Sequence, residues 1–150
     1  MEDVKKIQVT SQDLRDGKWD DSISFTDAGQ NASPELTWDS IEGAGEYAVY
    51  MIDEYDTDYW LHWRVSGIGE PGFEHGENPG EYVGPYPPEG VHIYVIYVFA
   101  LKGPAASYPG NFDAESVSVD VVREGLDQAA DGGKGNIIAE GSITGTYAAV

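Results

Sequence analysis

Residues 91–101 are the segment that most constrains how this chain can fold. They read Val-His-Ile-Tyr-Val-Ile-Tyr-Val-Phe-Ala-Leu, and Gly90 precedes them. β-branched and aromatic residues favour extended strands, and glycine is typical of the turns that bound a strand. Because the run is apolar at odd and even positions alike, both of its faces require cover. The sequence therefore predicts a central strand here, covered on both sides, and not an edge strand.

Shorter patterns of the same kind recur along the chain. Residues 47–53 and 61–65 are rich in β-branched and aromatic residues, and weaker strand patterns lie at 5–9, 22–26, 35–38 and 137–147. Nineteen glycines and eight prolines supply turns between them. About seven short strands separated by turns predict an all-β fold, an antiparallel β-sandwich. With 150 residues and no linker or internal repeat, residues 1–150 are interpreted as a single domain.

One segment departs from the strand pattern. Between Asp113 and Ala130, apolar residues recur at helical spacing, namely at Val117, Val121, Val122, Leu126 and Ala129. Asp113 or Ser116 could cap the start of a short peripheral helix, and Gly132-Gly133 could end it. The segment 66–90 is long and dense in glycine and proline, which is typical of a functional or mobile loop.

The charge balance and the cysteine count exclude several classes of partner and chemistry. Asp and Glu total 27 against 8 Lys and Arg, for a formal net charge of −19. Nucleic acid and anionic membrane surfaces are polyanions, so we expect neither as a partner. The chain has no cysteine, which excludes disulfides, zinc–thiolate sites and a cysteine nucleophile. Residues 1–14 contain no apolar run, so we expect no integral membrane contact and a cytoplasmic location, although a chain whose signal peptide had been removed would look the same.

Several polar side chains lie within or at the ends of the predicted strands. Asp53 ends one strand, His62 lies in the next, and His92 shares a face with Tyr94 in the strand 91–101. A carboxylate, two imidazoles and a hydroxyl can form one small polar pocket. They can equally be unrelated polar residues, each satisfied on its own. The spacing leaves both interpretations open.

The alternation of side chains also predicts which way His62 faces. It places His62 on one face of its strand with Arg64, and Leu61, Trp63 and Val65 on the other face. The third histidine, His75, lies in the glycine-rich segment and is expected to be solvated.

The chemistry of such a pocket suits an anion or a polar head group. Imidazole and backbone N–H donors can bind phosphate-like oxygens, and a nearby carboxylate favours the charged form of a histidine. Two histidines and one aspartate could also hold a metal, but there is no HExxH or comparable ligand spacing, so no metal is expected. The acidic stretch 53–58 lacks the Gly and Glu of a calcium loop and is interpreted as solvated. A serine hydrolase is not expected, because the sequence has no GxSxG motif.

Six short motifs occur in the order typical of one known family. They are NASPELTW at 31–38, the strand 47–53 leading into an acidic motif, WLHW at 60–63, YVGPYPPEG at 82–90, VHIY at 91–94, and IAEG followed by GTY between 138 and 147. On these motifs the chain resembles the phosphatidylethanolamine-binding protein (PEBP) family, also called Raf-kinase-inhibitor-like proteins. The resemblance is greatest to its short bacterial branch, the YbhB/YbcL-like proteins. It covers residues 7–147 of the sequence.

The resemblance implies a Greek-key β-sandwich with a small anion-binding pocket near one end. Carried over position by position, it implies the following lining residues: Asp53, Trp60, His62, Tyr82, Gly84, Pro85, Tyr86, His92 and Tyr94. It further implies that His62 and His92 donate to the anion and that Gly84 exposes backbone N–H groups. Asp53 would orient an imidazole or accept from an ammonium group. Trp60, Tyr82 and Tyr86 would form the walls.

The chain departs from the family pattern at two positions. The family's DPD motif reads Asp53-Glu54-Tyr55 here, and the arginine after the pocket histidine is replaced by Ile93. In typical members the second aspartate of DPD and this arginine are thought to pair. Because both partners are replaced, no buried charge is left unpaired, and we interpret the change as a rebuilt pocket wall. Asp56 could substitute for the missing aspartate only if the loop shifted its register.

Three functional hypotheses follow. The first is a non-enzymatic, cofactor-free binding protein for a small phosphorylated or otherwise anionic ligand, which by resemblance could inhibit or regulate a kinase or protease and could form a homodimer. The second is a carbohydrate-binding module or a small glycosidase-like sandwich. It rests on the 12% aromatic content and the surplus of carboxylates, with Asp53 and an acid from 74–81 as the catalytic pair. The third is a PEBP fold that keeps only a vestigial pocket.

Overall fold

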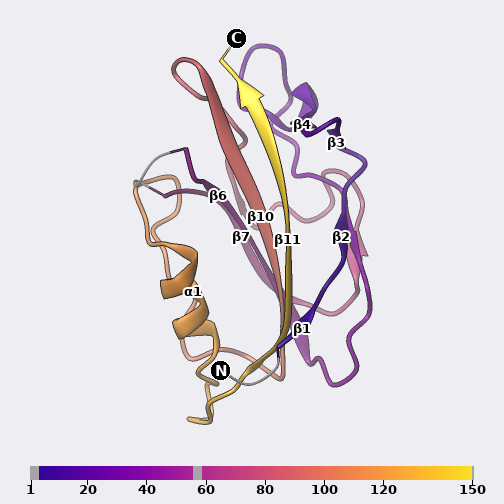
Figure 1. Cartoon of the computed structure of the whole chain (residues 1–150), viewed down its shortest axis with the longest axis vertical. Coiled ribbons are helices and arrows are strands. Elements are labelled where there is room, and N and C mark those ends of the chain that lie inside the picture. The colour runs from indigo at the N-terminus through magenta and orange to yellow at the C-terminus, as the bar shows by residue number, and fades with distance from the viewer. Residues whose placement is uncertain (1–3, 56–58, 150) are drawn as a thin grey trace.

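The centre of the molecule is one long strand with a neighbour on each side (Figure 1). The computed structural model describes residues 4–55 and 59–149. Strand β10, Val91–Leu101, pairs antiparallel with β6, Glu46–Asp53, and with β11, Ile137–Ala148. From Tyr94 to Leu101 every residue of β10 is buried. The predicted central strand, covered on both sides, is therefore confirmed.

Two sheets form the sandwich. The larger has eight strands in the order β3-β4-β11-β10-β6-β7-β9, with β1 paired to β11 beside this path, and the smaller has the order β2-β5-β8. The remaining bounds are β1 Lys5–Lys6, β2 Val9–Thr10, β3 Leu14–Arg15, β4 Lys18–Trp19, β5 Leu36–Trp38, β7 Trp60–Ile68, β8 Gly72–Phe73 and β9 Glu81–Tyr82. Strands distant in sequence lie side by side, as Greek-key connections produce. The all-β sandwich class is confirmed, except that β1 and β4 run parallel to β11.

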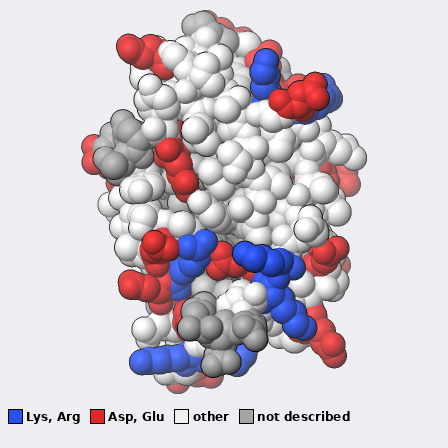
Figure 2. Space-filling model, in the orientation of Figure 1, with Lys and Arg blue, Asp and Glu red and all other residues white. Residues whose placement is uncertain are grey.

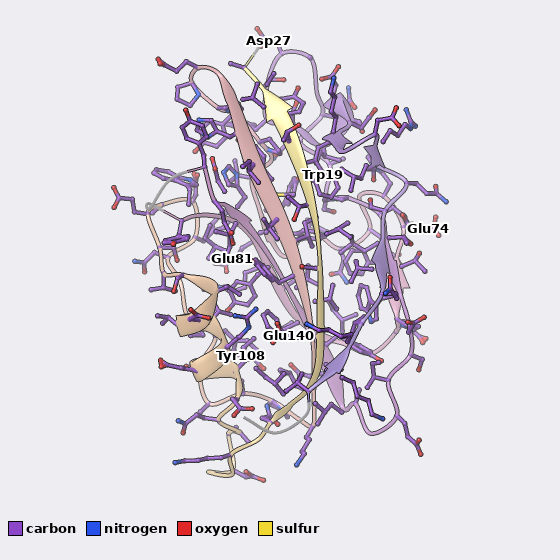
Figure 3. All side chains as sticks on the ribbon, viewed as in Figure 1. Trp19, Asp27, Glu74, Glu81, Tyr108 and Glu140 are labelled. Carbon is purple, nitrogen blue, oxygen red and sulfur yellow. The ribbon has the colours of Figure 1, made fainter. Side chains whose placement is uncertain are left out.

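A hydrophobic layer lies on each face of the larger sheet. The inter-sheet core, between the two sheets, includes Met51, Trp63 and Ile96. The helix-side core lies beneath helix α1, Val119–Leu126, which turns Val122 and Leu126 inward. Figure 1 shows α1 on one side of the sheet and β2 on the other, and Figure 3 shows the side chains that fill both layers. From Tyr94 to Leu101, both faces of β10 are thus removed from water.

The predicted helix exists but is shorter than the segment 113–130. It begins after Ser118, whose backbone is extended, and it ends at Leu126, before Asp127. Residues 112–115 instead make isolated bridges to β7, so neither Asp113 nor Ser116 caps the helix. Among the described residues, no helix is long and apolar enough to cross a lipid bilayer.

The strand predicted at 22–26 is wrong. Residues Asp21–Ile23 form a short 3₁₀ helix, because the carboxylate of Asp20 accepts from the N–H of Ser22 and caps the turn. Ile23 is fully buried by the turn. A local side-chain hydrogen bond therefore overrides the weak strand pattern.

The glycine-rich segment 66–90 is more ordered than its composition suggests. It contains the end of β7 and the short strands β8 and β9. His75 lies in this segment, and its Nδ1 is 3.0 Å from Oδ2 of Asp13. The prediction of a solvated His75 is confirmed, since the residue is exposed, and its side chain also pairs with Asp13.

Arg64 of β7 fastens the connection between β10 and α1 to the sheet. Its Nη1 donates to the carbonyl oxygens of Tyr108, Pro109 and Gly110, at 3.0, 3.2 and 2.6 Å. Its Nε and Nη2 reach Glu81, at 2.9 and 2.7 Å. Figure 3 labels Tyr108 and Glu81 on this side of the sheet. One guanidinium thus satisfies three carbonyls that the turn itself leaves unpaired.

Replacing Arg64 with methionine should lower the free energy of unfolding by about 1–3 kcal/mol, because these carbonyls lose a charged donor. Urea denaturation followed by tryptophan fluorescence measures the change. Arg15→Met is the matched control, since the guanidinium of Arg15 is largely exposed and 3.8 Å from Asp20. The control should change stability by less than about 0.5 kcal/mol. Equal effects of the two substitutions would contradict the anchoring role of Arg64.

Candidate ligand-binding site

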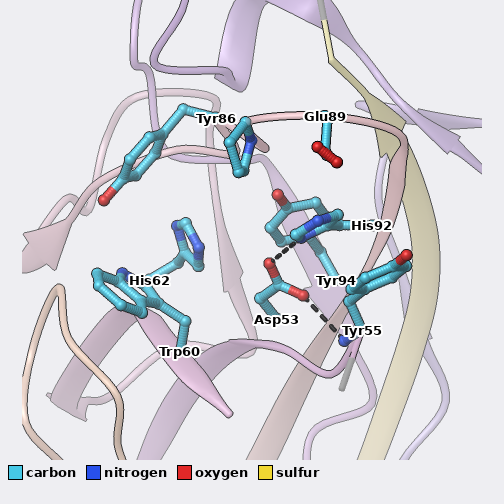
Figure 4. Close-up of a pocket in the computed structure, with 9 residues that line it drawn as sticks. Asp53, Tyr55, Trp60, His62, Tyr86, Glu89, His92 and Tyr94 are labelled. Atoms are coloured by element: carbon cyan, nitrogen blue, oxygen red, sulfur yellow. Dashed lines mark hydrogen bonds and ion pairs between the residues drawn. The ribbon is translucent and has the colours of Figure 1, made fainter. Parts of the chain in front are cut away.

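A cavity of about 530 Å³ opens where β6 ends and β10 begins (Figure 4). Its size falls in the range of small-molecule sites. The lining residues are Asp53, Tyr55, Trp60, His62, Tyr86, Pro88, Glu89, His92 and Tyr94. The polar residues expected to converge at the strand ends therefore do surround one cavity.

Sheet register places three of these side chains together. Asp53 of β6 lies directly opposite Tyr94 of β10, so their side chains share a face. His92 lies two residues before Tyr94 and shares that face as well. This face is the one that carries the inter-sheet core, to which Tyr94 belongs. The cavity is thus the open end of the layer between the sheets.

A β-bulge brings His62 into the same space. Met51 pairs with Trp63 but the next residue, Ile52, pairs with Leu61, so His62 is an extra residue in β7. As a result Leu61 packs in the helix-side core and Trp63 in the inter-sheet core. The prediction that these two residues share a face, opposite His62, is wrong because the bulge resets the alternation. His62 instead packs edge-on against Tyr94, with ring centroids 5.2 Å apart.

His92 is held by a carboxylate and an aromatic ring. Its Nδ1 is 2.6 Å from Oδ2 of Asp53, and Oδ1 of Asp53 accepts from the N–H of Tyr55 at 2.9 Å. Both side chains of the pair are largely buried. The ring of Tyr55 stacks on the imidazole, with centroids 4.1 Å apart and planes 4° from parallel. Because an ionised carboxylate only accepts, Nδ1 of His92 carries the hydrogen and Nε2 is left for a ligand.

His62 is fixed in a complementary way by the backbone. Its Nδ1 is 2.8 Å from the carbonyl oxygen of Val83, which can only accept, so Nδ1 is the donor. The ring is almost completely buried. Burial lowers the pKa of His62, against the smaller opposing effects of the Val83 carbonyl and of the carboxylates of Asp53 and Asp113. The neutral ring therefore carries its hydrogen on Nδ1 and a lone pair on Nε2, and the residue is one of those that line the cavity.

Tyr94 contributes a hydroxyl that makes no hydrogen bond of normal geometry, although the carboxylate of Asp53 and the N–H of Tyr86 lie close to it. The residue is fully buried, and its Oη has no hydrogen-bond partner among the described residues. Burial, reinforced by the nearby carboxylate of Asp53, raises the pKa of Tyr94 far above its ordinary value, so the hydroxyl keeps its proton. A buried hydroxyl without a partner costs free energy unless a ligand or water supplies one.

Asp113 holds one wall of the cavity in place. Its Oδ1 accepts from Nε1 of Trp60 at 3.1 Å and from the hydroxyl of Tyr86 at 2.7 Å. Burial and the Asp113 carboxylate raise the pKa of Tyr86 to about 12. Two aromatic side chains from different segments are thus fixed by one carboxylate, in a residue predicted only as a possible helix cap.

Three residues that the resemblance places in the pocket lie outside it. The hydroxyl of Tyr82 donates to the carbonyl of Ile23 at 2.6 Å, and the carbonyl of Pro85 accepts from Phe25 at 3.0 Å. The N–H of Gly84 donates to Oδ1 of Asn31 at 2.7 Å. A Cβ at position 84 would lie only 1.9 Å from the Ile23 carbonyl oxygen.

These contacts correct the roles expected for this loop. The N–H of Gly84 is consumed within the protein, and its missing side chain accommodates backbone of the segment 21–26, not a ligand. The residues around 82–85 therefore anchor the loop that carries Tyr86 and Glu89.

Sequence reasoning missed three lining residues: Tyr55, Pro88 and Glu89. Tyr55 drew notice only as a departure from the DPD motif, and Glu89 lies in the motif YVGPYPPEG, three residues before His92. The other departure, Ile93, is half-exposed and is not part of the lining. Asp56 and the end of the acidic stretch 53–58 lie outside the described residues, so the calcium-loop and register-shift interpretations stay untested.

The charges of the lining are unusual for an anion site. Asp53 and Glu89 contribute two carboxylates, and none of the lining residues is lysine or arginine. Within residues 4–55 and 59–149, no group of three or more His, Asp or Glu side chains could hold a metal ion. On the face shown in Figure 2, lysine and arginine gather in groups that acidic side chains adjoin. Among the described lining residues, positive charge can therefore come only from a protonated imidazole, and burial disfavours that form for His62.

The fold and cavity define a β-sandwich binding fold with a small ligand pocket at one end of the inter-sheet layer. A family model described as phosphatidylethanolamine-binding protein matches residues 10–148. The chain therefore belongs to the phosphatidylethanolamine-binding protein family.

Known proteins show how far the likeness extends. A UPF0098 protein of Methanothermobacter thermautotrophicus is 26% identical over 144 residues, covering 82% of this chain and 87% of its own. LppC of Mycobacterium tuberculosis, named as a candidate lipoprotein, is 31% identical over 59% of this chain and 52% of its own, so this chain spans about half of that relative. The crystal structure of CT736 of Chlamydia trachomatis, named as a candidate PEBP homologue, superposes with a TM-score of 0.69 at 23% identity, covering 95% of this chain and 97% of its own. That likeness supports the fold.

The buried, neutral state of His62 gives a test by pH. The folded pKa is below the unfolded value of about 6.5, so between these two values the unfolded chain binds more protons. The free energy of unfolding should therefore fall as the pH is lowered below about 6.5, by up to about 1.4 kcal/mol per pH unit from this residue. Urea denaturation at several pH values measures the slope.

His62→Phe should flatten that slope, because it removes the titrating group and keeps a ring in the bulge. His75→Phe is the control and should leave the contribution of His62 in place. A His62→Phe protein with the same pH dependence as the unmodified chain would contradict the assignment.

Proposed function

We propose that this chain is a non-enzymatic binding protein that holds a small phosphoryl or similar anionic group between His62 and His92. The observation that carries the proposal is the hydroxyl of Tyr94, buried without a partner at the edge of the cavity. That hydroxyl is closed to water in this structure, and it keeps its proton and can donate to a ligand oxygen that reaches it. Nε2 of His92 becomes a second donor whenever that imidazole is protonated. The family name, which refers to phosphatidylethanolamine, is consistent with a ligand that carries a phosphoryl group.

The lining supports binding over catalysis. Among the described residues, the lining contains no serine, threonine, cysteine or lysine that could act as a nucleophile. Both oxygens of Asp53 already accept hydrogen bonds, from His92 and from the N–H of Tyr55. A carboxylate engaged in this way orients an imidazole and is poorly placed to attack a substrate.

The same contacts weigh against a glycosidase. Of the acids in 74–81, Glu81 pairs with Arg64, and none lines the cavity. Glu89 is the second carboxylate of the cavity instead. Asp53 is committed to His92, so the described part of the lining offers no pair of free carboxylates, as glycoside hydrolysis needs.

An open cavity with an unpartnered donor also favours a working pocket over a vestigial one. A pocket without a ligand gains stability by closing over such a hydroxyl or by losing it. The roles as a kinase or protease regulator, the homodimer and the cytoplasmic location stay predictions from the resemblance and the composition.

Phosphate should raise the melting temperature of the protein, because a ligand that binds only the folded state stabilises it. At a concentration about 100 times Kd the rise should be roughly 5–10 °C. Differential scanning fluorimetry in a buffer without other oxyanions measures it.

His92→Ala should abolish the rise, and Tyr94→Phe should reduce it. His75→Ala is the matched control, since His75 pairs with Asp13 and is not part of the lining, and it should keep the full rise. No response to phosphate at millimolar concentration, or an undiminished response in His92→Ala, would refute the proposed function.

A further inference from the structure

The hydrogen-bonding capacity of the cavity is dominated by acceptors. Nδ1 of His62 is committed to the Val83 carbonyl, so the nitrogen left for a ligand, Nε2, carries a lone pair and no hydrogen. Glu89 adds a carboxylate to the lining. The donors are the hydroxyls of Tyr94 and Tyr55 and, when that imidazole is protonated, Nε2 of His92. The two imidazoles therefore play opposite roles, although the resemblance implies that both donate.

A fully deprotonated oxyanion complements the donors of the cavity but not the acceptor on His62. Its oxygens can accept from Tyr94, but an oxygen placed near His62 would face the lone pair of Nε2. A phosphoryl group that retains one P–OH fits both ends, because the hydroxyl donates to His62 while the other oxygens accept from Tyr94. An acceptor that faces another acceptor in a buried site costs more than a hydrogen bond contributes.

The negative charge around the cavity also favours the protonated form of the phosphoryl group. Asp53 and Glu89 line the cavity, Asp113 stands behind its wall, and the chain carries a formal net charge of −19. Each additional negative charge on a ligand is therefore repelled, and no lysine or arginine in the lining offsets it. A singly charged ligand meets less repulsion than a doubly charged one.

We propose that the cavity selects a phosphoryl group that still carries a proton, as in the monoanion of a phosphomonoester, over oxyanions that have no proton to donate. His62, as a fixed acceptor, is the residue that determines this specificity. The inference rests on the proposed function, since it names the chemical form of the group that the same cavity holds. It also distinguishes a phosphomonoester from the phosphodiester of an intact phospholipid, which has no P–OH at neutral pH.

Three probe ligands distinguish the effect of the ligand's proton on affinity from the effects of its charge and its shape. Methyl phosphate at about pH 6, near the second pKa of a phosphomonoester, is present in part as a monoanion with one P–OH. Dimethyl phosphate has the same single charge and no proton to donate. Sulfate has the shape of phosphate, no methyl group and no proton to donate.

Isothermal titration of the full chain with each probe at this pH gives the affinities. We expect methyl phosphate to bind at least about tenfold more tightly than dimethyl phosphate or sulfate. If the three bind equally, the inference is overturned and the proposed function stands. If none binds at millimolar concentration, the proposed function itself fails. Ethanolamine, which donates through an ammonium group, overturns the inference if it binds as tightly as methyl phosphate.

A variant and a spectroscopic measurement assign the effect to His62. His62→Phe keeps a ring of similar size without the acceptor, so the ratio of the methyl phosphate and dimethyl phosphate affinities should fall to about one, whereas His75→Phe should preserve it. An unchanged ratio in His62→Phe overturns the inference. Because His62→Phe could unfold, ¹⁵N NMR of the histidines in the unmodified chain is an independent test. It should show His62 as the neutral Nδ1–H tautomer, and a protonated Nε2 on His62 would overturn the assignment.

Discussion

The register between β10 and β6 is the constraint on which the rest of the site depends. Asp53 lies opposite Tyr94, and His92 follows on the same face because side chains alternate along a strand. A shift of this pairing by one residue would turn every one of these groups to the other face. The register is fixed in turn by burial, since β10 is apolar on both faces and each face packs into its own core. Hydrophobic packing far from the cavity therefore determines the position of each polar group within it.

The sequence predicts the central strands and most of the lining residues, because residue type and periodicity determine where long strands form and which way their side chains point. Periodicity and residue type predicted β10, β6 and β7, because runs of β-branched and aromatic residues leave few alternatives, and a weaker pattern predicted β11. Six of the nine residues expected at the pocket do line it, chiefly those on strands, where position along the chain translates into direction in space. The family resemblance supplied their grouping, which spacing alone left undecided.

The wrong predictions share one cause, which is that they depend on local irregularities or long-range contacts that the residue pattern does not encode. The facing of Leu61 and Trp63 was predicted wrongly because a bulge adds one residue to β7 without leaving a mark in the residue pattern. The strand expected at 22–26 is replaced by a short 3₁₀ helix, because the N–H of Ser22 donates a capping hydrogen bond to the carboxylate of Asp20. The roles of Tyr82 and Gly84 depend on contacts between loops. The role of Asp113 depends on its contact with Trp60, which is 53 residues away in the sequence. Local pattern carries no information about contacts of that range.

The attachment of Gly84 to Asn31 has a consequence for how such chains diversify. Two of the motifs that the chain shares with its family, NASPELTW and YVGPYPPEG, meet in that contact. The hydrogen bond between them anchors a loop to the rest of the sandwich. Tyr55, the lining residue at which the chain departs from the family's DPD motif, has no part in this contact. The contact that anchors the loop and the position at which the pocket lining departs from the family pattern are therefore separate, so a substitution at position 55 can alter the lining while the loop keeps its anchor.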